Sequence, residues 1–477
     1  MNLSRAVSRP EDTSSWHNIN EKMKFRHLLS ITIALLGSNS TFSQSTNEYV
    51  NYFSNNAFGN PIVGKAGEHY KGVTYVAYQG EKEDSYVAAY HHETRKWIGP
   101  YKAGTSLLGK TPGMKIDNHG KPTLVVDGEG YIHVVFGGHG GTKDLGENTL
   151  GNYFKGKQIH VKTKKPMDIS SWEVVDNITP FGTYSQFLKM DNGDIYLIFR
   201  HGAHRSNWVY QISKDNGRTF TPKVSFLDAK PTEEDVNDWD SWYIDLARGE
   251  GNDILVSYNY HFCKSSKKGH DGERHHGYFM KLDTDSKEWF NVKGEKLAIP
   301  VTKEQADTMT LVKNTGDLWN HIGKVGLSKD GLPRVSWYEG EHDGSKHGGP
   351  KQLVGYQWTG SQWIGSRSNL PIEARGEIRA ISIDSVSYLL GSMQQNMGEV
   401  AWWHGVDGGV NFSKGEVLLK HNGEKITLSH FIRNSHPDAM ILATQKIKGT
   451  DYSKIFLLGE NGAIERTKNE ADILEIE

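Results

Sequence analysis

The sequence lacks several features that would place it in common classes of protein. Its 477 residues contain one cysteine, Cys263, so no disulfide can form within the chain. The 55 lysine and arginine residues are balanced by 57 aspartate and glutamate residues, which excludes the polybasic surface of a typical nucleic-acid-binding protein. The apolar run at residues 28–37 is too short to span a membrane. We therefore expect no nucleic-acid partner and no membrane partner, and an anionic ligand would need a local positive pocket.

The N-terminus has the pattern of an export signal. Residues 23–44 begin at a second methionine with basic residues, continue through the short apolar run and end in small polar residues. We interpret residues 23–44 as a signal peptide of a secreted protein, extracellular or periplasmic, and residues 1–22 as a doubtful extension. The alternative is an amphipathic N-terminal helix of the mature protein. Secreted proteins usually carry disulfides, so another device must occupy the thiol of Cys263.

Proline is scarce, with 14 residues, whereas 52 glycines and 11% aromatic residues suit short strands and tight turns. One sequence motif, a turn followed by a strand of alternating apolar and polar residues, recurs at intervals of roughly 50 to 80 residues. Repetition of this kind without long helices predicts an all-β fold, a seven-bladed β-propeller that forms a single domain over residues 47–477. Tandem β-sandwiches are the alternative, but they would not keep one motif at one spacing. The seven copies lie at residues 72–80, 129–141, 193–202, 252–262, 331–340, 386–394 and 438–446.

One copy contains a recognisable turn motif. Ser213, Asp215, Gly217, Thr219 and Phe220 form the pattern SxDxGxTF, an Asp-box hairpin. The carboxylate and the hydroxyl groups of this motif satisfy backbone donors in the turn. The motif therefore indicates architecture, not chemistry.

Candidate catalytic residues lie at the ends of strands in two adjacent repeats. His119 and His139 flank one repeat, and Tyr184 and Arg200 occupy the corresponding positions in the next. We expect these four side chains to converge. Taken singly, each has an equally plausible structural role: His139 could cap a strand, and Tyr184 could be a core tyrosine with its hydroxyl group on the backbone.

These residue types suit removal of the proton α to a uronate carboxylate, followed by loss of the 4-linked sugar. Arg200 would bind the carboxylate and stabilise its developing charge. Tyr184 and His119 would form the acid/base pair, one taking the C5 proton and the other serving the leaving oxygen. Tyr184 could act as the base only if nearby positive charge stabilised its phenolate.

Other residues are candidates for binding substrate. Tyr243 and Trp208 offer flat faces for sugar rings, and Arg205 offers a cation. His321 follows Asn320 as His119 follows Asn118, so we expect it to face the axis from across the ring.

A second group of residues predicts a metal site. His261 and Cys263 are two residues apart on a strand, and a returning hairpin would bring His275 and His276 beside them. A thiolate with imidazoles suits a tetrahedral zinc ion with a structural role. The alternative is a buried thiol with histidines that face solvent. Calcium is disfavoured because it prefers oxygen ligands.

The segments at residues 117–141 and 183–210 resemble the BNR-type propellers of ulvan lyases, polysaccharide lyase family 25. The resemblance implies a seven-bladed propeller that cleaves ulvan by β-elimination between sulfated rhamnose and glucuronate or iduronate. We expect the protein to be a monomer. It also implies catalytic roles for His119 and Tyr184, a carboxylate-neutralising role for Arg200 and an active-site role for His139. The family's zinc would fall on the hairpin of His261, Cys263, His275 and His276, and its additional pocket tyrosine on Tyr243 or a neighbour. Candidates for binding sulfate are Arg205, Arg379 and Lys162.

Two other functions remain open from the sequence. A sialidase-like glycoside hydrolase shares the Asp box, but it needs three arginines around one carboxylate, and only Arg200 stands convincingly at a strand end. A non-catalytic carbohydrate-binding propeller would use the same aromatic walls, but it would not need His119, Tyr184 and Arg200 to converge.

Overall fold

The computed structural model describes residues 48–62, 64–110, 115–229, 241–262, 271–382, 384–407 and 409–475. The chain divides into two compact units, residues 1–46 and 47–477. The predicted extension and signal peptide therefore lie outside the described residues, as does Cys263. Within the described residues, no helix has both the length and the apolar character needed to cross a membrane.

The second unit consists mainly of β-strands. Five of its sheets each correspond to a single blade and share no strand with another sheet. Each sheet is built from strands that are consecutive in the chain and antiparallel. Their main strands are β7 (Thr123–Val126), β8 (Ile132–His139), β9 (Lys155–Lys165) and β10 (Asp168–Val175); β11 (Thr183–Lys189), β12 (Ile195–Arg200), β13 (Trp208–Ser213) and β14 (Val224–Leu227); β15 (Ser241–Arg248), β16 (Asp253–His261), β17 (Arg274–Asp283) and β18 (Glu288–Phe290); β21 (Trp319–Leu327), β22 (Pro333–Gly340), β23 (Gln352–Trp358) and β24 (Trp363–Arg367); and β25 (Arg375–Ala380), β26 (Val386–Gln394), β27 (Met397–Gly405) and β28 (Phe412–Asn422).

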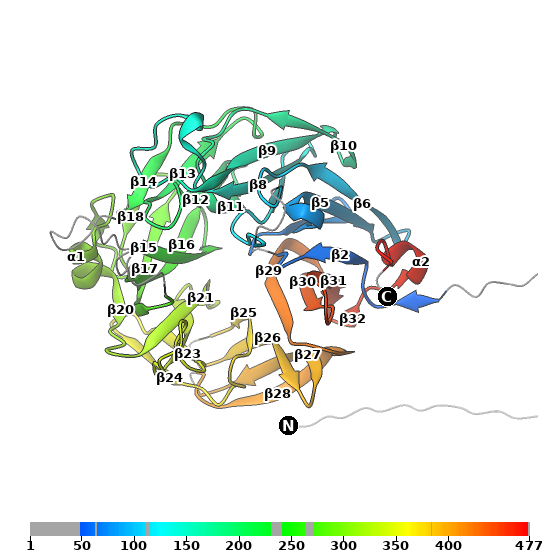
Figure 1. Ribbon diagram of the computed structural model, residues 1–477. Coiled ribbons are helices and arrows are strands. Elements are labelled where there is room, and N and C mark those ends of the chain that lie inside the picture. The colour runs from blue at the N-terminus through cyan, green and yellow to red at the C-terminus, as the bar shows by residue number, and fades with distance from the viewer. Residues whose placement is uncertain are drawn as a thin grey trace, which may run out of the picture. The chain divides into compact units, whose positions relative to one another are not determined.

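The sixth sheet has nine strands and joins the two ends of the unit. One half contains β3 (Gly67–Tyr70), β4 (Val73–Gln79), β5 (Ser85–His91) and β6 (Lys96–Gly104). The other half contains β29 (Ile426–His436), β30 (Ala439–Lys446), β31 (Tyr452–Gly459) and β32 (Gly462–Ala463), with the N-terminal β2 (Ser54–Phe58) paired to β31. The halves meet at a single parallel pair, Arg433 with Glu68. Figure 1 shows the sheets around a ring in chain order, with the blue β2 beside the red β31.

The predicted repeat corresponds to one position in these sheets. All seven sequence copies fall on the strand next to the innermost one, namely β4, β8, β12, β16, β22, β26 and β30. These strands read as nearly continuous apolar runs because neighbouring sheets cover both of their faces. Val125 and Val135 of one sheet, for example, pack against Phe187 and Leu197 of the next. The prediction of an all-β propeller is confirmed, with five separate sheets and a shared nine-stranded sheet.

The Asp box forms as the sequence predicts. Ser213 Oγ accepts a hydrogen bond from the Gly217 N–H at 2.8 Å, and Asp215 Oδ1 accepts one from the Thr219 N–H at 2.9 Å. The Thr219 hydroxyl group donates to Asp215 Oδ2 at 2.6 Å. Phe220 packs against the core between two sheets. The motif closes a hairpin and contributes no group to the site described below.

The longest interval between repeats contains additional elements. They extend the third separate sheet with β19 (Lys296–Leu297) and β20 (Leu311–Lys313), and they include α1 (Lys303–Gln305) and the π-helical turn η3 (Ala306–Thr310). The remaining short elements are β1 (Tyr49–Val50), β33 (Arg466–Thr467), α2 (Lys468–Ala471), η1 (Glu81–Glu83) and η2 (Lys143–Leu145).

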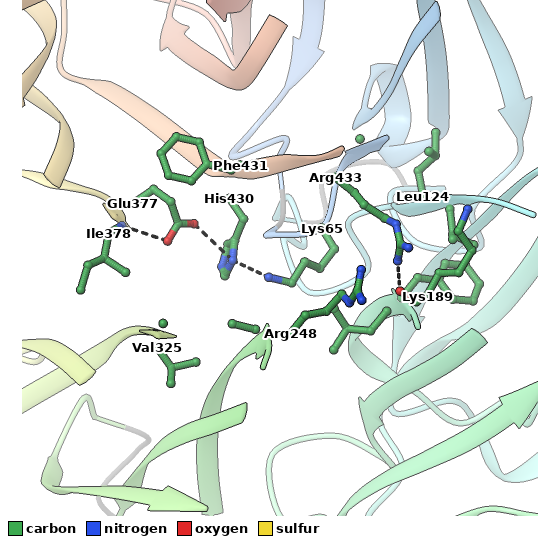
Figure 2. A pocket seen from close by; sticks show the side chains of 16 residues that line it. Lys65, Leu124, Lys189, Arg248, Val325, Glu377, Ile378, His430, Phe431 and Arg433 are labelled. Carbon is green, nitrogen blue, oxygen red and sulfur yellow. Dashed lines mark hydrogen bonds and ion pairs between the residues drawn. The ribbon is translucent and has the colours of Figure 1, made fainter. Parts of the chain in front are cut away.

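An ionic network crosses the axis of the ring. The His430 imidazole lies 2.8 Å from Asp245 Oδ1, 3.3 Å from Glu377 Oε2 and 2.7 Å from Lys65 Nζ. Lys324 Nζ lies 3.6 Å from Glu377. His430 lines a cavity on each side, one of about 480 Å³ and one of about 260 Å³. Figure 2 shows the smaller cavity, with Glu377, His430 and Lys65 linked in a row.

Candidate active site

The larger cavity lies at the end of the ring where the innermost strands begin. Its lining includes Tyr184 at the start of β11, Tyr243 of β15, Arg274 of β17 and His321 of β21, together with Trp208. These side chains come from three sheets, and Tyr184, Tyr243 and His321 lie near the beginnings of innermost strands, which meet at the axis. A tyrosine, a histidine and an arginine thus meet at this cavity, as the sequence predicts.

Asp117 holds two of the predicted histidines in place. Its Oδ1 accepts a hydrogen bond from His119 Nδ1 at 2.6 Å, and its Oδ2 accepts one from His139 Nδ1 at 2.6 Å. The two imidazole rings stack with their centroids 3.7 Å apart. Burial acts to raise the pKa of Asp117, but the hydrogen bonds from both histidines hold that pKa well below its usual range. Burial lowers the pKa of His139 to about 4, so this imidazole is neutral at pH 7.

Tyr184 adopts a strained backbone beside this group. Its φ is 57°, in the left-handed region that a bulky residue rarely occupies, and its N–H donates to the His119 carbonyl at 3.3 Å. Its ring centroid lies 5.1 Å from that of His119. Burial, reinforced by the neighbouring Tyr243, raises the pKa of Tyr184 despite the nearby arginines. Tyr184 is therefore a neutral phenol at pH 7 and has a proton to donate.

Tyr243 has the opposite electrostatic environment. Burial acts to raise its pKa, but the charges of Arg274 and Arg200 and their hydrogen bonds to its oxygen lower that pKa below its usual value. The guanidinium carbons lie 4.0 Å (Arg274) and 5.5 Å (Arg200) from the centroid of the Tyr243 ring. Arg200 is fully buried, and its Nε and Nη1 find no hydrogen-bond partner among the described residues. The floor of the site thus holds positive charge without a carboxylate partner among the described residues.

Other predicted substrate-binding residues divide into two sets. His321 and Trp208 line the cavity, and His321 Nδ1 accepts a hydrogen bond from Arg274. Arg205 instead follows β12, where its N–H donates to Asn152 Oδ1 at 2.9 Å. The remaining sulfate candidates have other contacts. Lys162 lies 3.2 Å from Glu173 on β9 and β10, and Arg379 stacks on Trp402 with 4.6 Å between its guanidinium carbon and the ring centroid.

The predicted metal hairpin is formed by β16 and β17, where Tyr260 pairs with His275 and His261 with Arg274. The Nδ1 atoms of His261 and His275 lie 2.5 Å and 3.0 Å from the carbonyl oxygens of Glu273 and Gly316. This arrangement directs the Nε2 atom of each histidine away from those carbonyl groups, and His275 Nε2 lies 3.1 Å from Glu273 Oε1. His276 Nδ1 accepts a hydrogen bond from the Thr315 N–H at 3.2 Å. Imidazoles such as those of His261 and His275 are ligands that suit zinc, but the described residues of this hairpin do not form a group of three ligand atoms, and the predicted ligand Cys263 lies outside the described residues.

Asp117, His119 and His139 also bring three potential metal-ligating atoms within 4.8 Å of one another. However, Lys155 Nζ lies 3.0 Å from Asp117 Oδ2 and already supplies a cation there. Both carboxylate oxygens accept hydrogen bonds from imidazole N–H groups. We therefore assign this group to the orientation of the histidines.

Sequence reasoning missed two important residues. Asp117 stands two residues before His119, and an acidic residue so close to a candidate catalytic histidine was an available signal. Arg274 directly precedes His275 and His276, so the sequence places it in the predicted metal hairpin and gives no sign of a role at the catalytic cavity. Its partner in the β16–β17 register is His261, but its guanidinium group faces Tyr243 and His321 at the cavity.

The chain matches one family of repeat proteins and is similar to several known proteins over most of its length. Residues 73–367 match the family described as "BNR repeat-containing family member". The chain is 46% identical to an ulvan lyase of Nonlabens ulvanivorans, with 94% of this chain and 98% of the relative covered. It is 47% identical to an ulvan lyase of Alteromonas sp. (strain LOR), with 88% of each covered. A solved ulvan lyase of polysaccharide lyase family 25, bound to -[GlcA(1-4)Rha3S]-, is 45% identical, with a TM-score of 0.85 over 89% of this chain and 98% of that chain.

Proposed function

Because this chain belongs to the ulvan lyases of polysaccharide lyase family 25, we propose that it cleaves ulvan by β-elimination. The bond cleaved joins sulfated rhamnose to glucuronate or iduronate, and the product carries an unsaturated uronate end. The observation that carries the proposal is the convergence of His119, held by Asp117, with the neutral phenol of Tyr184 above two arginines. That arrangement supplies a base next to an acid, and the acid lines a cavity that also holds the cation of Arg274.

His119 is the base in this mechanism. Its Nδ1–H donates to Asp117, which leaves the lone pair of Nε2 available and stabilises the imidazolium ion that forms. His119 takes the C5 proton of the uronate, and the electrons of that C–H bond form the C4–C5 double bond as the bond from C4 to the leaving oxygen breaks. Tyr184 gives its phenolic proton to the leaving oxygen. Transfer of a proton from His119 to Tyr184 then restores both groups.

The arginines stabilise the charge on the reacting sugar. Removal of the C5 proton spreads negative charge onto the uronate carboxylate, so a fixed guanidinium lowers the barrier. Arg274 lines the cavity and can contact that carboxylate, whereas the fully buried Arg200 contributes its charge from beneath Tyr184 and Tyr243. His139 keeps its imidazole stacked on His119 and fixes the plane of the base.

The reaction product distinguishes this function from the two alternatives. Only a lyase generates the unsaturated uronate, which absorbs ultraviolet light. A sialidase-like hydrolase would release reducing ends without that absorbance, and a carbohydrate-binding propeller would release neither. Incubation of the protein with ulvan, followed by measurement of both signals, tests the proposal.

Two substitutions test the assigned roles. We expect His119→Ala and Tyr184→Phe each to lose nearly all turnover, by about 10²- to 10⁴-fold, because each removes a proton-transfer group. Thermal unfolding should remain close to that of the wild type in Tyr184→Phe, since the ring is retained. A near-normal rate in Tyr184→Phe would remove this residue from the mechanism, and the His119→Ala result would still stand on its own.

We also propose finer features of the protein. The nine-stranded sheet counts as two blades joined at one pair, which supports a seven-bladed ring. The pattern of residues 23–44 supports secretion, and we propose that the secreted protein is a monomer. A structural zinc ion would be held by His261 and His275 with Cys263 and His276, and it would fasten the β16–β17 hairpin beside the site. Loss of the metal on treatment with a chelator, measured by elemental analysis, tests the zinc proposal.

A further inference from the structure

A cluster of histidines lies at the seam of the nine-stranded sheet, at the end of the ring opposite the catalytic groups. His69 lies near the end of the innermost strand β3, whereas Tyr184 lies at the beginning of the innermost strand β11. His92 follows β5, and His436 ends β29. The imidazole centroids of His92 and His436 are 3.8 Å apart, and those of His69 and His92 are 5.1 Å apart.

Three side chains of this cluster present metal-ligating atoms to one point. One atom each of His92, His436 and Asp438 lies within 4.8 Å of the other two. Donors around a zinc ion at 2.0–2.2 Å are separated by about 3.5 Å, so the side chains must draw inward slightly. Asp438 is 54% exposed and His436 is 36% exposed, which leaves both free to make that adjustment.

The His92 imidazole is prepared for such a role. Its Nε2 lies 2.8 Å from the Thr74 hydroxyl oxygen, while its Nδ1 is buried and has no hydrogen-bond partner among the described residues. In the tautomer in which Nε2–H donates to the Thr74 hydroxyl oxygen, Nδ1 of His92 presents a lone pair, the usual arrangement at metal sites.

The cluster lies where a bound ion could connect the two halves of the nine-stranded sheet. The two halves of the nine-stranded sheet are joined by the single backbone pair of Arg433 and Glu68. His92 belongs to the N-terminal half, and His436 and Asp438 belong to the C-terminal half. An ion bound by all three would connect the first and last repeats, a connection that disulfides provide in many secreted proteins and that a chain with one cysteine cannot make.

We propose that His92, His436 and Asp438 form a second metal site, which binds a divalent transition metal such as Zn²⁺ across the seam of the ring. Two imidazoles and one carboxylate favour zinc, cobalt or nickel over calcium or magnesium, which prefer oxygen donors alone. The partial exposure of the site leaves room for water as a further ligand. This site shares no residue with the zinc site proposed on the β16–β17 hairpin.

The test compares metal stoichiometry in matched variants of the full-length protein. The protein is stripped with a chelator, titrated with Zn²⁺ by calorimetry, and then melted with and without the ion. We expect His436→Asn and Asp438→Asn each to bind one ion fewer than the wild type and to lose the increase in melting temperature that the seam ion provides. The control is His404→Gln, because His404 is a half-buried histidine 3.4 Å from the Glu416 carboxylate and belongs to no three-residue group among the residues that the structure describes.

The design separates a loss of metal from a loss of fold. Asp438→Asn changes an exposed turn residue, and lyase activity reports whether the distant site remains intact. Equal stoichiometry in the wild type, His436→Asn and Asp438→Asn would overturn the proposal, since the imidazoles would then be a neutral packed cluster around Thr74. Loss of one ion in His404→Gln as well would overturn it too, because the binding would then be nonspecific.

Discussion

The two cavities along the axis of the ring differ in how their charges are balanced. At the catalytic end, Arg200 is fully buried, and no described carboxylate lies within ion-pair distance of it or of Arg274. At the opposite end, Lys189 Nζ lies 2.6 Å from the buried Glu68, and Arg433 Nε lies 3.2 Å from the same carboxylate. Arg433 also donates to the Lys189 carbonyl, as Figure 2 shows.

This difference distinguishes charge that serves a ligand from charge that serves the fold. An unpaired buried cation destabilises the protein, so it persists where an incoming anion offsets its desolvation. The charge of a paired cation is already offset by its carboxylate partner, so the pair attracts an anionic substrate only weakly. Replacement of a cation by methionine should therefore have opposite consequences at the two ends.

The largest expected effect is on activity, in Arg200→Met. Removal of a guanidinium group that stabilises the developing carboxylate charge should lower kcat by about 10²- to 10³-fold. Stability should hold or rise, because a buried charge without a carboxylate partner is replaced by an apolar chain. Initial rates on ulvan and urea unfolding measure the two quantities. A clear fall in stability would show that Arg200 has a structural role as well.

The sequence predicted the repeat because its cause is local. Strands such as β12 are covered on both faces, so their apolar runs repeat at every blade. The Asp box was also predictable, because all of its hydrogen bonds lie within Ser213–Thr219. The shared nine-stranded sheet was not, since it depends on the pairing of Arg433 with Glu68, more than 300 residues apart in the chain.

The candidate site was predictable to the same extent. His119, His139, Tyr184 and Arg200 stand at repeated strand ends, and the structure brings them together. Their protonation was not predictable. The sequence left open whether nearby positive charge would stabilise a Tyr184 phenolate. Burial outweighs the arginines and raises the pKa of Tyr184, whereas the charges of Arg274 and Arg200, with their hydrogen bonds, outweigh burial and lower the pKa of Tyr243. That balance depends on tertiary packing.

A smaller effect, on stability, is expected for Lys189→Met at the opposite end. The substitution leaves Glu68 buried with Arg433 and the Val126 N–H as its remaining partners, so the free energy of unfolding should fall by about 3 kcal/mol. Activity on ulvan at moderate temperature should stay close to that of the wild type. Urea unfolding measures the change, and the double variant Lys189→Met/Glu68→Gln should recover part of the loss.

The smallest effect is expected for Arg248→Gln, which also lines the smaller cavity. Arg248 Nη2 lies 2.5 Å from Asp191 Oδ1, but the Asp191 side chain is 70% exposed, so solvent screens the pair. The free energy of unfolding should fall by less than about 1 kcal/mol, and the difference from the wild type should shrink further at high salt. Urea unfolding at low and high ionic strength measures both. A loss of stability as large as that of Lys189→Met would contradict the idea that solvent exposure makes the Arg248–Asp191 pair weaker than the Lys189–Glu68 pair. Arg248 would then stabilise the smaller cavity by more than its ion pair.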